Sequence, residues 1–328
     1  MTRVNFWLVI LMSMYIPSRG EAEQPTPSIQ LAPKQAAVFP GQVVTRTIQI
    51  DLASRESRIA WRFSVGPRTV SRREQAVPWQ QGSPAEVEIE LSMPPLRDSV
   101  ALTAELQVDL ISATGESLAQ ARQTFWVLAE DPFADRTRWL EGMKMLLYDP
   151  IGDTGDRFDA AGIPYRFVRT LSALRAASDG CVVIGEDVSF ANQPGLFPAL
   201  VQLAADGRRV LVFAPKDGKF QLPKRETKSS AATSVILHGP EVIGKLDKRL
   251  DTNLTADDEP PQGSAWRLAA SHGKVVLQTG AMDSGWPWVE FRYSNGGRLI
   301  LCGFPIINSW DVGPTPRYLL SAIFENIE

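Results

Sequence analysis

The stretch that decides the fold is residues 144–168, Lys-Met-Leu-Leu-Tyr-Asp-Pro-Ile-Gly-Asp-Thr-Gly-Asp-Arg-Phe-Asp-Ala-Ala-Gly-Ile-Pro-Tyr-Arg-Phe-Val. Met145 to Tyr148 is a short apolar run, which is typical of a strand buried on both faces. Asp153 or Thr154 can cap a following helix, and Gly162 can end it. A second strand follows that helix. The stretch therefore predicts the opening βαβ unit of an open α/β sheet.

Beyond this unit the order strand, helix, strand repeats. Apolar strands are predicted at Cys181 to Ile184 and Arg209 to Phe213, and the helix between them begins at Pro194. This order implies parallel pairing with right-handed crossovers. Later strands include a pair joined by the hairpin turn Asn295-Gly296-Gly297, which adds an antiparallel edge. We expect a mostly parallel, three-layer α/β domain over residues 138–328.

The first part of the chain, residues 36–129, has a period of two instead. Val87, Ile89 and Leu91 alternate with glutamates, and three other runs have the same pattern. One apolar and one polar face per strand indicates antiparallel sheets. About seven strands separated by turn signals are typical of an immunoglobulin-like β-sandwich. With a linker at 130–137, the chain is predicted to be a multidomain β plus α/β protein.

Residues 1–22 resemble a secretory signal peptide, with Arg3, an apolar run from Val4 to Ile16, and a small-residue end at Ala22. A retained anchor is the alternative, but that run is shorter than the roughly 20 residues that span a bilayer. Residues 23–35, rich in Pro, Gln and Ser, are expected to form a mobile leader. The expected location is therefore secreted or periplasmic.

Composition excludes several classes of protein. The 328 residues are 44% hydrophobic, as in globular proteins, and the formal net charge is −3. An acidic balance argues against nucleic acid as a partner. No later segment is apolar enough to cross a membrane. The two cysteines, Cys181 and Cys302, lie at opposite ends of predicted neighbouring strands, so we expect buried free thiols, with a disulfide as the alternative.

The second region resembles the glutamine-amidotransferase-like fold, a flavodoxin-type sheet. It is most similar to the non-catalytic version that serves as the trimerisation domain of some β-galactosidases. The features that carry this resemblance are Leu147-Tyr148-Asp149-Pro150, Ala161-Gly162-Ile163-Pro164-Tyr165, the stretch Ala205 to Val212, and Gly296-Gly297-Arg298-Leu299-Ile300. They cover a little over half the chain and indicate a fold rather than a reaction.

The catalytic residues of that family are not matched. Where its enzymes place a cysteine nucleophile, this chain has Ala214-Pro215-Lys216-Asp217. A triad also needs a histidine, and the two present, His238 and His272, lie in no recognisable motif. The resemblance therefore implies no glutaminase activity, and we assign no catalytic residue on this basis.

Acidic side chains follow several predicted parallel strands. Asp149, Glu186, Asp187 and Asp217 should converge on the carboxyl edge of the sheet, where open α/β sheets bind ligands. Two carboxylates across a cleft could act as acid and base in glycoside cleavage, and Asp149, Glu186 and Asp217 are the candidates if the protein is an enzyme. The alternative is that these acids cap helices and turns.

Two other functions of the loop after Tyr148, nucleotide binding and metal binding, are disfavoured. Gly152 and Gly155 do not have the dinucleotide-binding spacing, and Asp149, Asp153 and Asp156 would repel a phosphate. The same acids match no calcium-loop pattern, and acids in the first turn of a helix already favour its dipole. We therefore expect neither a cofactor nor a metal.

Aromatic residues lie beside turns near the C-terminus, in Trp286-Pro287-Trp288 and Trp310-Asp311. Exposed tryptophan next to a hydrogen-bond acceptor suits a sugar, so Trp286, Trp288, Trp310 and Asp311 are the candidate ligand-binding residues. The alternative is that these rings close the edge of the sheet or a domain interface.

The sequence thus favours an exported, non-catalytic binding or assembly protein of the cell envelope, with a link to carbohydrate that rests on fold analogy. A glycan or an envelope protein is the expected partner, and self-association is a further option. A carboxylate-dependent hydrolase acting on glycans and a purely structural oligomerisation module are the alternatives.

Overall fold

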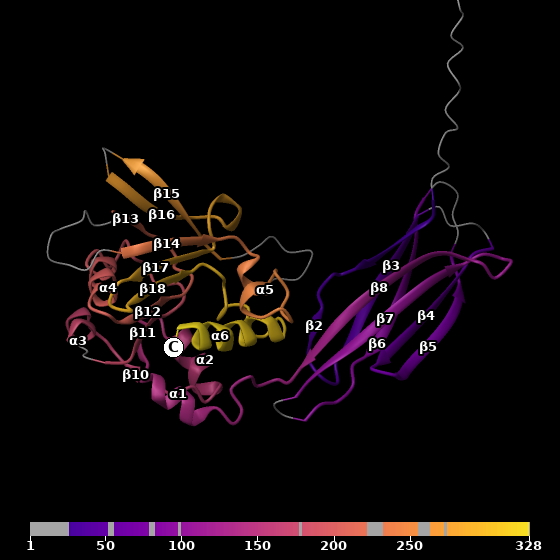
Figure 1. The fold of residues 1–328 in the computed structure, drawn as a ribbon, viewed down its shortest axis with the longest axis horizontal. Helices are drawn as coiled ribbons and strands as arrows, with labels where there is room; N and C mark the ends of the chain where they lie inside the picture. Colours follow the sequence, from indigo (N-terminus) through magenta and orange to yellow (C-terminus); the bar gives the residue numbers. More distant parts are fainter. Residues whose placement is uncertain are drawn as a thin grey trace, which may run out of the picture.

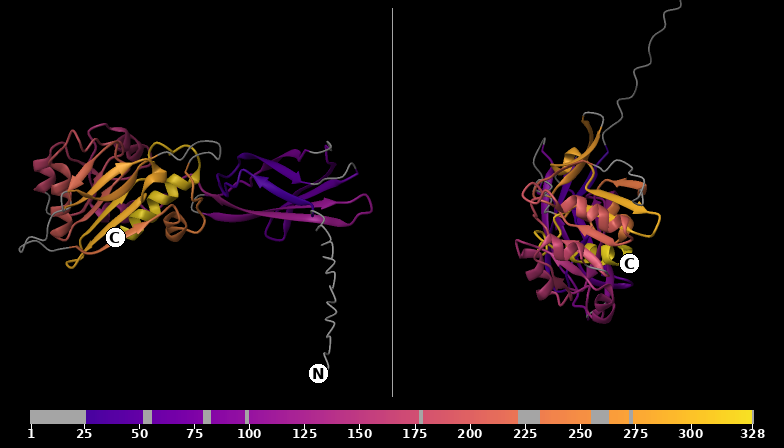
Figure 2. Two further views of the ribbon diagram at one scale, coloured as in Figure 1. Left: turned by 90° about the horizontal axis from the view of Figure 1, so that it is seen from above. Right: turned by 90° about the vertical axis from the view of Figure 1, so that its left-hand side faces the viewer.

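A computed structural model of the chain describes residues 26–51, 56–78, 83–97, 100–176, 179–221, 232–254, 263–271 and 274–327. The fold is mostly β, with several sheets, two of them mixed, and few helices. Two parts lie side by side along the long axis (Figures 1 and 2). We call residues 28–128 the β-region and residues 137–327 the α/β region. The expected signal peptide, residues 1–22, lies outside the described residues.

The β-region consists of two sheets packed face to face. One sheet has the strand order β1-β3-β6, with β1 at Ser28–Ala32, β3 at Val43–Asp51 and β6 at Ala85–Ser92. The other has the order β2-β8-β7-β4-β5, with β2 at Ala37–Val38, β8 at Ser117–Leu128, β7 at Ala101–Ile111, β4 at Arg58–Val65 and β5 at Arg68–Ala76. All pairings are antiparallel except that of β2 with β8.

Alternating side chains form the core between these sheets. In β6 the residues alternate strictly between buried and exposed, and Phe63 of β4 contacts Phe125 of β8 edge to face, with ring centroids 5.9 Å apart. The described residues of the β-region contain eight strands rather than the expected seven, because β5 is largely polar and exposed and has no hydrophobic pattern that would predict it. Ser28–Ala32, which lies within the expected leader at 23–35, pairs with β3.

A seven-stranded mixed sheet forms the centre of the α/β region. Its order is β10-β9-β11-β12-β18-β17-β14. The first five strands are parallel, and β17 and β14 add the predicted antiparallel edge. Their bounds are β10 Arg166–Phe167, β9 Leu146–Tyr148, β11 Cys181–Ile184, β12 Arg209–Val212, β18 Arg298–Cys302, β17 Trp288–Tyr293 and β14 Ala232–His238.

Helices cover both faces of this sheet, which explains why β9 and β11 are buried throughout. On one face are α1, α2, α5 and α6, at Thr137–Met143, Asp153–Ala160, Val242–Leu246 and Pro314–Ile327. On the other face are α3 at Leu171–Arg175 and α4 at Leu196–Ala205. The helix α1 begins within the predicted linker and was not expected. No helix in the described residues has the length and hydropathy that a membrane crossing requires.

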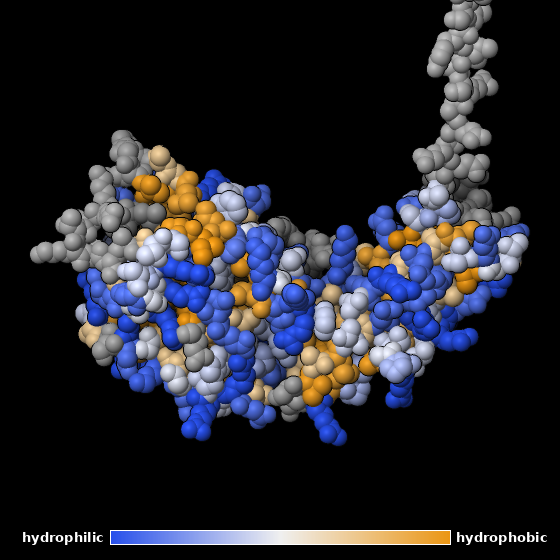
Figure 3. Space-filling model, viewed as in Figure 1, coloured by the Kyte–Doolittle hydropathy of each residue, from blue (hydrophilic) through white to orange (hydrophobic). Residues whose placement is uncertain are grey.

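A small third sheet packs beside α4. It has the order β13-β16-β15, with β13 at Lys219–Gln221, β16 at Lys274–Gly280 and β15 at Ala265–Ser271. Trp266, Leu277 and Phe220 bring its inner face into the same core as α4. A one-turn 3-10 helix, η1 at Met282–Ser284, leads from it back to β17. Leu268 and Val275 remain exposed and contribute to the apolar surface over β15 and β16 (Figure 3).

The two regions share a continuous seam. Ala37, Leu128 and Phe133 belong to the same buried cluster as α1 and α6. The carboxylate of Asp251 accepts hydrogen bonds from the N–H groups of Ala36 (2.7 Å) and Ala37 (3.0 Å) at the start of β2. Arg317 of α6 lies over the Phe39 ring and donates to the carbonyl of Glu130 at 3.0 Å. The linker is therefore packed rather than free.

The expected buried free thiols are confirmed. Cys181 is the first residue of β11 and Cys302 the last of β18, and β12 lies between these two strands. Both side chains are almost fully buried, and burial raises the pKa of each thiol to about 12.

The hairpin between β17 and β18 allows a direct test of the packing. A Cβ on Gly297 would overlap the backbone carbonyl of Ala204 at the end of α4. We predict that Gly297→Ala lowers the free energy of unfolding by about 1–3 kcal/mol, measured by urea denaturation. Gly244→Ala is the matched control, since that site is open and helical, and it should be neutral or stabilising by up to about 1 kcal/mol. Equal effects of the two substitutions would contradict this packing.

Candidate functional site

A cleft of about 420 Å³ lies at the carboxyl edge of the parallel strands. The loops after β11, β12 and β18 form part of its wall, and the start of β15 and the end of β16 complete it. Its charged and amide side chains are Glu186, Asp187, Lys216, Asp217 and Asn308. Open α/β sheets bind ligands at this edge because the loops that follow the strands gather there. We therefore take this cleft as the candidate functional site.

Glu186 follows β11 and is 2% exposed. Its two carboxyl oxygens accept hydrogen bonds from the backbone N–H groups of Ile307 (2.8 Å) and Asn308 (3.1 Å), in the loop after β18. Burial raises the pKa of Glu186 to about 8, even though these N–H donors favour the ionised form. At neutral pH this carboxyl group is mostly protonated, and it links two of the loops that form the cleft.

Asp187 and Asn308 form a polar pair at the wall of the cleft. The amide nitrogen of Asn308 donates to Oδ2 of Asp187 at 2.8 Å. Asp187 has a φ of +60°, which is uncommon for a residue other than glycine, and its backbone N–H donates to the carbonyl of Ala214 at 2.8 Å. The turn after β11 is thus fixed to the turn after β12. Both side chains remain partly open to solvent.

The Asp217 carboxylate joins the loop after β12 to the loop after β11. Its carboxylate accepts hydrogen bonds from the Ser189 hydroxyl, at 2.8 and 2.9 Å, and from the Ala191 N–H at 2.9 Å. The side chain is only partly buried, so part of it still faces the cleft. The structure therefore brings Glu186, Asp187 and Asp217 into one cleft, as the sequence predicted.

Asp149 does not belong to this cleft. It is 1% exposed, and its carboxylate accepts hydrogen bonds from the N–H groups of Gly152 (3.1 Å) and Gly155 (3.0 Å) at the start of α2. Asp149 therefore caps α2 from the strand before it, which corrects the predicted caps. Asp153 makes no capping hydrogen bond, and the Thr154 hydroxyl instead accepts the N–H of Glu186 at 2.9 Å.

The crevice between β9 and β11 is closed by this same aspartate. A Cβ on Gly185 would lie 2.8 Å from the Asp149 carboxyl carbon, so Asp149 fits only against glycine there. In sheets of this order, this crevice is where the strand connections change direction and where ligands commonly bind. Here it is filled by protein, and the open cleft lies one strand further along the sheet.

The turn after β12 contains Ala214 and Pro215, which line the cleft and supply no nucleophilic atom. His238 lies in β14, where its Nδ1 is 3.2 Å from the Lys245 ammonium and 3.8 Å from Oε1 of Glu241. No thiol or hydroxyl of the described residues contacts it. His272 lies outside the described residues.

The four candidate ligand-binding residues near the C-terminus do not form one exposed surface. Trp288 and Trp310 are 2% and 6% exposed and belong to the hydrophobic core, so neither presents a ring face to solvent. Trp286 is 43% exposed, and its backbone pairs with Trp266 in β15. Asp311 is exposed but forms ion pairs with Arg157 (2.9 Å) and Arg317 (3.2 Å). Of the three tryptophans, Trp286 alone is exposed to solvent.

Sequence reasoning missed three polar residues of the cleft. Asn308 follows β18, so the rule that selected Glu186 and Asp217 could have found it. Lys216 lies in the turn after β12 and was not predicted to have a role of its own. Ser264 had no sequence signal; it precedes β15, lines the cleft and is 8% exposed, and its hydroxyl has no hydrogen-bond partner among the described residues.

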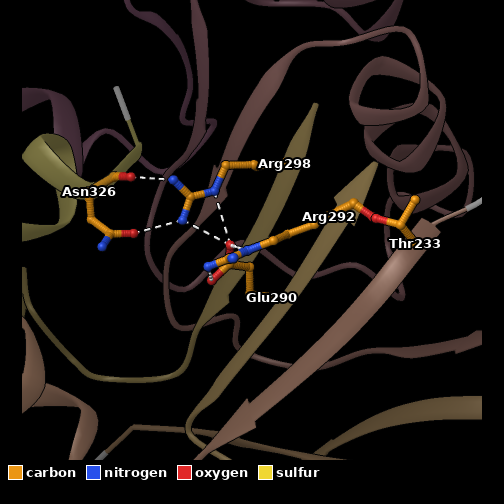
Figure 4. A network of polar contacts seen from close by, with 5 residues as sticks. All are labelled: Thr233, Glu290, Arg292, Arg298 and Asn326. Atoms are coloured by element: carbon orange, nitrogen blue, oxygen red, sulfur yellow. Dashed lines mark hydrogen bonds and ion pairs between the residues drawn. The ribbon is translucent and has the colours of Figure 1, made fainter. Parts of the chain in front are cut away.

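A second polar cluster lies away from this cleft, at the β17–β18 hairpin (Figure 4). The buried carboxylate of Glu290 binds Arg292 at 2.6 Å and Arg298 at 2.8 Å, and Arg298 also donates to the Asn326 side chain at 2.7 Å. A hollow of about 310 Å³ adjoins it. Because Arg298 binds both Glu290 and Asn326, the cluster joins the hairpin to the end of α6. Among the described residues, no three His, Cys, Asp or Glu side chains converge to hold a metal ion.

Comparisons with known proteins give only distant similarities. No family model and no curated protein matches the chain. Among solved structures, it is similar to a Bifidobacterium dentium β-glucuronidase complexed with coumarin-3-O-glucuronide, at 12% identity and a TM-score of 0.24 over 57% of this chain and 44% of that one. It is also similar to a Paenibacillus sp. cycloisomaltooligosaccharide glucanotransferase complexed with cycloisomaltoheptaose, at 10% identity and a TM-score of 0.29 over 77% and 34%.

A third similarity is to the sensor domain of an anti-sigma factor from Pseudobacteroides cellulosolvens, at 14% identity and a TM-score of 0.20 over 31% of this chain and 90% of that one. The chain spans less than half the length of either carbohydrate-active enzyme. At these identities and TM-scores, the similarities decide neither an activity nor a ligand.

The capping role of Asp149 predicts a large effect on stability. Asp149→Ala leaves two N–H groups at the start of α2 without their acceptor, so it should lower the free energy of unfolding by about 2 kcal/mol in urea denaturation. Asp153→Ala removes an exposed carboxylate from the same helix turn and should cost less than about 1 kcal/mol. If both variants lose the same stability, Asp149 is not the cap.

The raised pKa of Glu186 predicts a pH dependence of stability. Between the ordinary value of 4.5 and about 8, the folded chain keeps a proton that the unfolded chain has lost. Stability from this group is therefore fully present below pH 4.5 and is lost as the pH rises through 8, by no more than about 1.4 kcal/mol per pH unit. Urea denaturation between pH 5 and 8 should show this decline, and Glu186→Gln should reduce it. An unchanged slope in the variant would assign the effect to another group.

Proposed function

We propose that the protein is an exported, non-catalytic binding or assembly protein of the cell envelope, and that its cleft binds a carbohydrate. The observation that carries this proposal is the chemistry of the cleft. It has charged and amide groups at the carboxyl edge of the sheet, and its turn after β12 contains Ala214 and Pro215, which supply no nucleophilic atom. The hydrogen bonds of Glu186 and Asp217 to neighbouring loops support a binding scaffold rather than a reaction centre.

The carbohydrate assignment follows from the groups that the cleft offers. Asp187 and Asp217 provide acceptors, Lys216 provides donors, and Asn308 provides both. A sugar hydroxyl both donates and accepts, so a polyhydroxylated ligand matches this mixture better than a simple anion or cation. Trp286 is joined to Trp266 by two backbone hydrogen bonds, and Trp266 lies two residues after Ser264 in the cleft wall. The exposed Trp286 side chain adds an apolar face for a sugar near the cleft.

The fold supports a finer description. Numbered by chain order, the five parallel strands have the order 2-1-3-4-5, as in flavodoxin-type sheets. This order agrees with the glutamine-amidotransferase-like resemblance of the α/β region. In the β-region, the parallel pairing of β2 with β8 and the three-plus-five strand arrangement agree with an immunoglobulin-like sandwich. We infer that an accessory sandwich is followed by a non-catalytic member of the amidotransferase-like fold.

One observation favours a second candidate function. Glu186 has a pKa of about 8 and shares the cleft with Asp187 and Asp217, which is the pairing of a protonated acid with a carboxylate that glycoside hydrolysis requires. A carboxylate-dependent hydrolase therefore remains the alternative. It would release reducing sugar from a glycan, and Glu186→Gln would abolish that release.

Export follows from the N-terminal sequence. Cleavage after Ala22 would give a mature chain beginning at Glu23, which N-terminal sequencing of the protein from a culture supernatant or periplasmic extract would detect. Detection of Met1 on the exported protein would instead support an anchor.

Binding to the cleft can be tested with an oligosaccharide array, followed by titration calorimetry with the glycan that binds best. We predict that Asp187→Asn weakens binding about tenfold, because a hydrogen bond to a charged acceptor contributes roughly 1.5 kcal/mol. Asp283→Asn removes an exposed carboxylate of η1 outside the cleft and should bind as the unsubstituted chain does. Absence of binding to every glycan, or equal affinity of the two variants, would overturn the carbohydrate assignment.

A further inference from the structure

One flank of the β-region ends in two edge strands of opposite charge. β5 is the last strand of the five-stranded sheet and β6 is the last of the three-stranded sheet, so within the described residues neither has a strand neighbour on its outer side. β5 carries Arg68, Arg72 and Arg73 and one acid, Glu74, which is already paired with Arg58 at 3.1 Å. β6 carries Glu86, Glu88 and Glu90 and no basic residue, and all of these side chains are exposed. We call this surface the edge flank.

The topology places both strands on the same flank. β1 packs against β8, so the opposite end of its sheet, β6, lies over the end of the other sheet that carries β4 and β5. β5 ends beside the start of β4, where the N–H of Val77 donates to the carbonyl of Ser57. β6 begins opposite the end of β3, where Ala85 pairs with Ile50. Since residues 52–57 join β3 to β4, these points share one end of the sandwich. β5 and β6 therefore run in opposite directions.

Among the described residues, most charges on the edge flank have no partner within one copy. No ion pair of the described residues includes any of the three arginines, Glu88 or Glu90, and Glu86 accepts only a hydrogen bond from Gln49. Arg72 shares the outer face of its sheet with Arg62, its register partner. The glutamates point outward from the other sheet, about 10 Å away. The thickness of the sandwich thus keeps the two sets of charges apart.

We propose that the edge flank binds a second copy of this chain, with β5 of each copy pairing antiparallel with β6 of the other. A two-fold axis parallel to the strands brings β5 of one copy beside β6 of its partner and keeps their opposite directions. The outer faces of the joined sheets then coincide, which places Arg72 beside the glutamate row across the new strand pair. Backbone N–H and C=O groups that are unpaired on both edges become paired.

The charge pattern also selects this pairing over others. Charged edge strands normally prevent association, and here two copies of β5 would place arginine against arginine, while two copies of β6 would place glutamate against glutamate. Only the β5–β6 combination joins opposite charges. A two-fold dimer forms this combination twice and leaves neither strand with an open edge on this flank. The flank therefore fits a second copy and opposes unspecific strand addition.

Sedimentation velocity of the purified protein tests this dimer. We expect a monomer–dimer equilibrium whose dissociation constant rises at least about tenfold between 0.05 and 0.5 M salt, because the charge pairs are screened. Arg72→Glu/Arg73→Glu and Glu88→Arg/Glu90→Arg should each be monomeric. A mixture of the two should form a heterodimer, since each β5 then again meets a β6 of opposite charge.

The control is Arg122→Glu/Arg209→Glu, which makes the same change in net charge at exposed positions away from the edge flank and should dimerise normally. A monomer at all concentrations up to about 100 μM in low salt overturns the proposal. So does a dimer that either charge-reversed variant still forms alone, because another surface must then mediate it. Should the variants fail to fold, the salt dependence and concentration-dependent amide-exchange protection of β5 and β6 in the unsubstituted chain decide the question.

Discussion

A buried carboxyl group must find hydrogen-bond donors, and this requirement shapes the ligand-binding edge of the α/β region. Asp149 meets it with the N–H groups at the start of α2, and Glu186 meets it with the loop after β18. Each carboxyl group thereby joins the end of one strand to a segment elsewhere in the chain. The same bonds close the crevice beside β9 and leave the open cleft between the next loops. Acids in such positions organise the site before they contact any ligand.

The sequence predicted the fold where the burial pattern was simple. Strands buried on both faces, such as Cys181–Ile184, and strands with one buried face, such as Ala85–Ser92, have distinct periods and were identified correctly. The strand Arg68–Ala76 was missed because nearly every residue is exposed, so no hydrophobic period marks it. The helix Thr137–Met143 was missed because it is short and its burial depends on contacts with distant segments.

The site was predictable only to the level of the sheet edge. Topology alone placed Glu186 and Asp217 together, since both follow parallel strands. Local sequence could not tell that Asp149 would turn inward, because it bonds to backbone N–H groups of α2 and needs the space that a glycine at 185 leaves for its carboxyl group. Nor could it tell that Trp288 is core and Trp286 is exposed, since Trp288 begins β17 whereas Trp286 precedes that strand and bridges to β15. Side-chain direction is set by packing that no short motif records.

The two buried cysteines provide a way to detect unfolding of the central sheet. Each thiol is enclosed and resists ionisation, and the two lie too far apart in the sheet to be oxidised to each other. A sulfhydryl-specific reagent should therefore ignore the native chain and modify it only when the central strands separate. Both positions would report the same global opening, one from each end of the parallel strands. The chain thus contains its own paired probes of cooperative unfolding, without any engineered label.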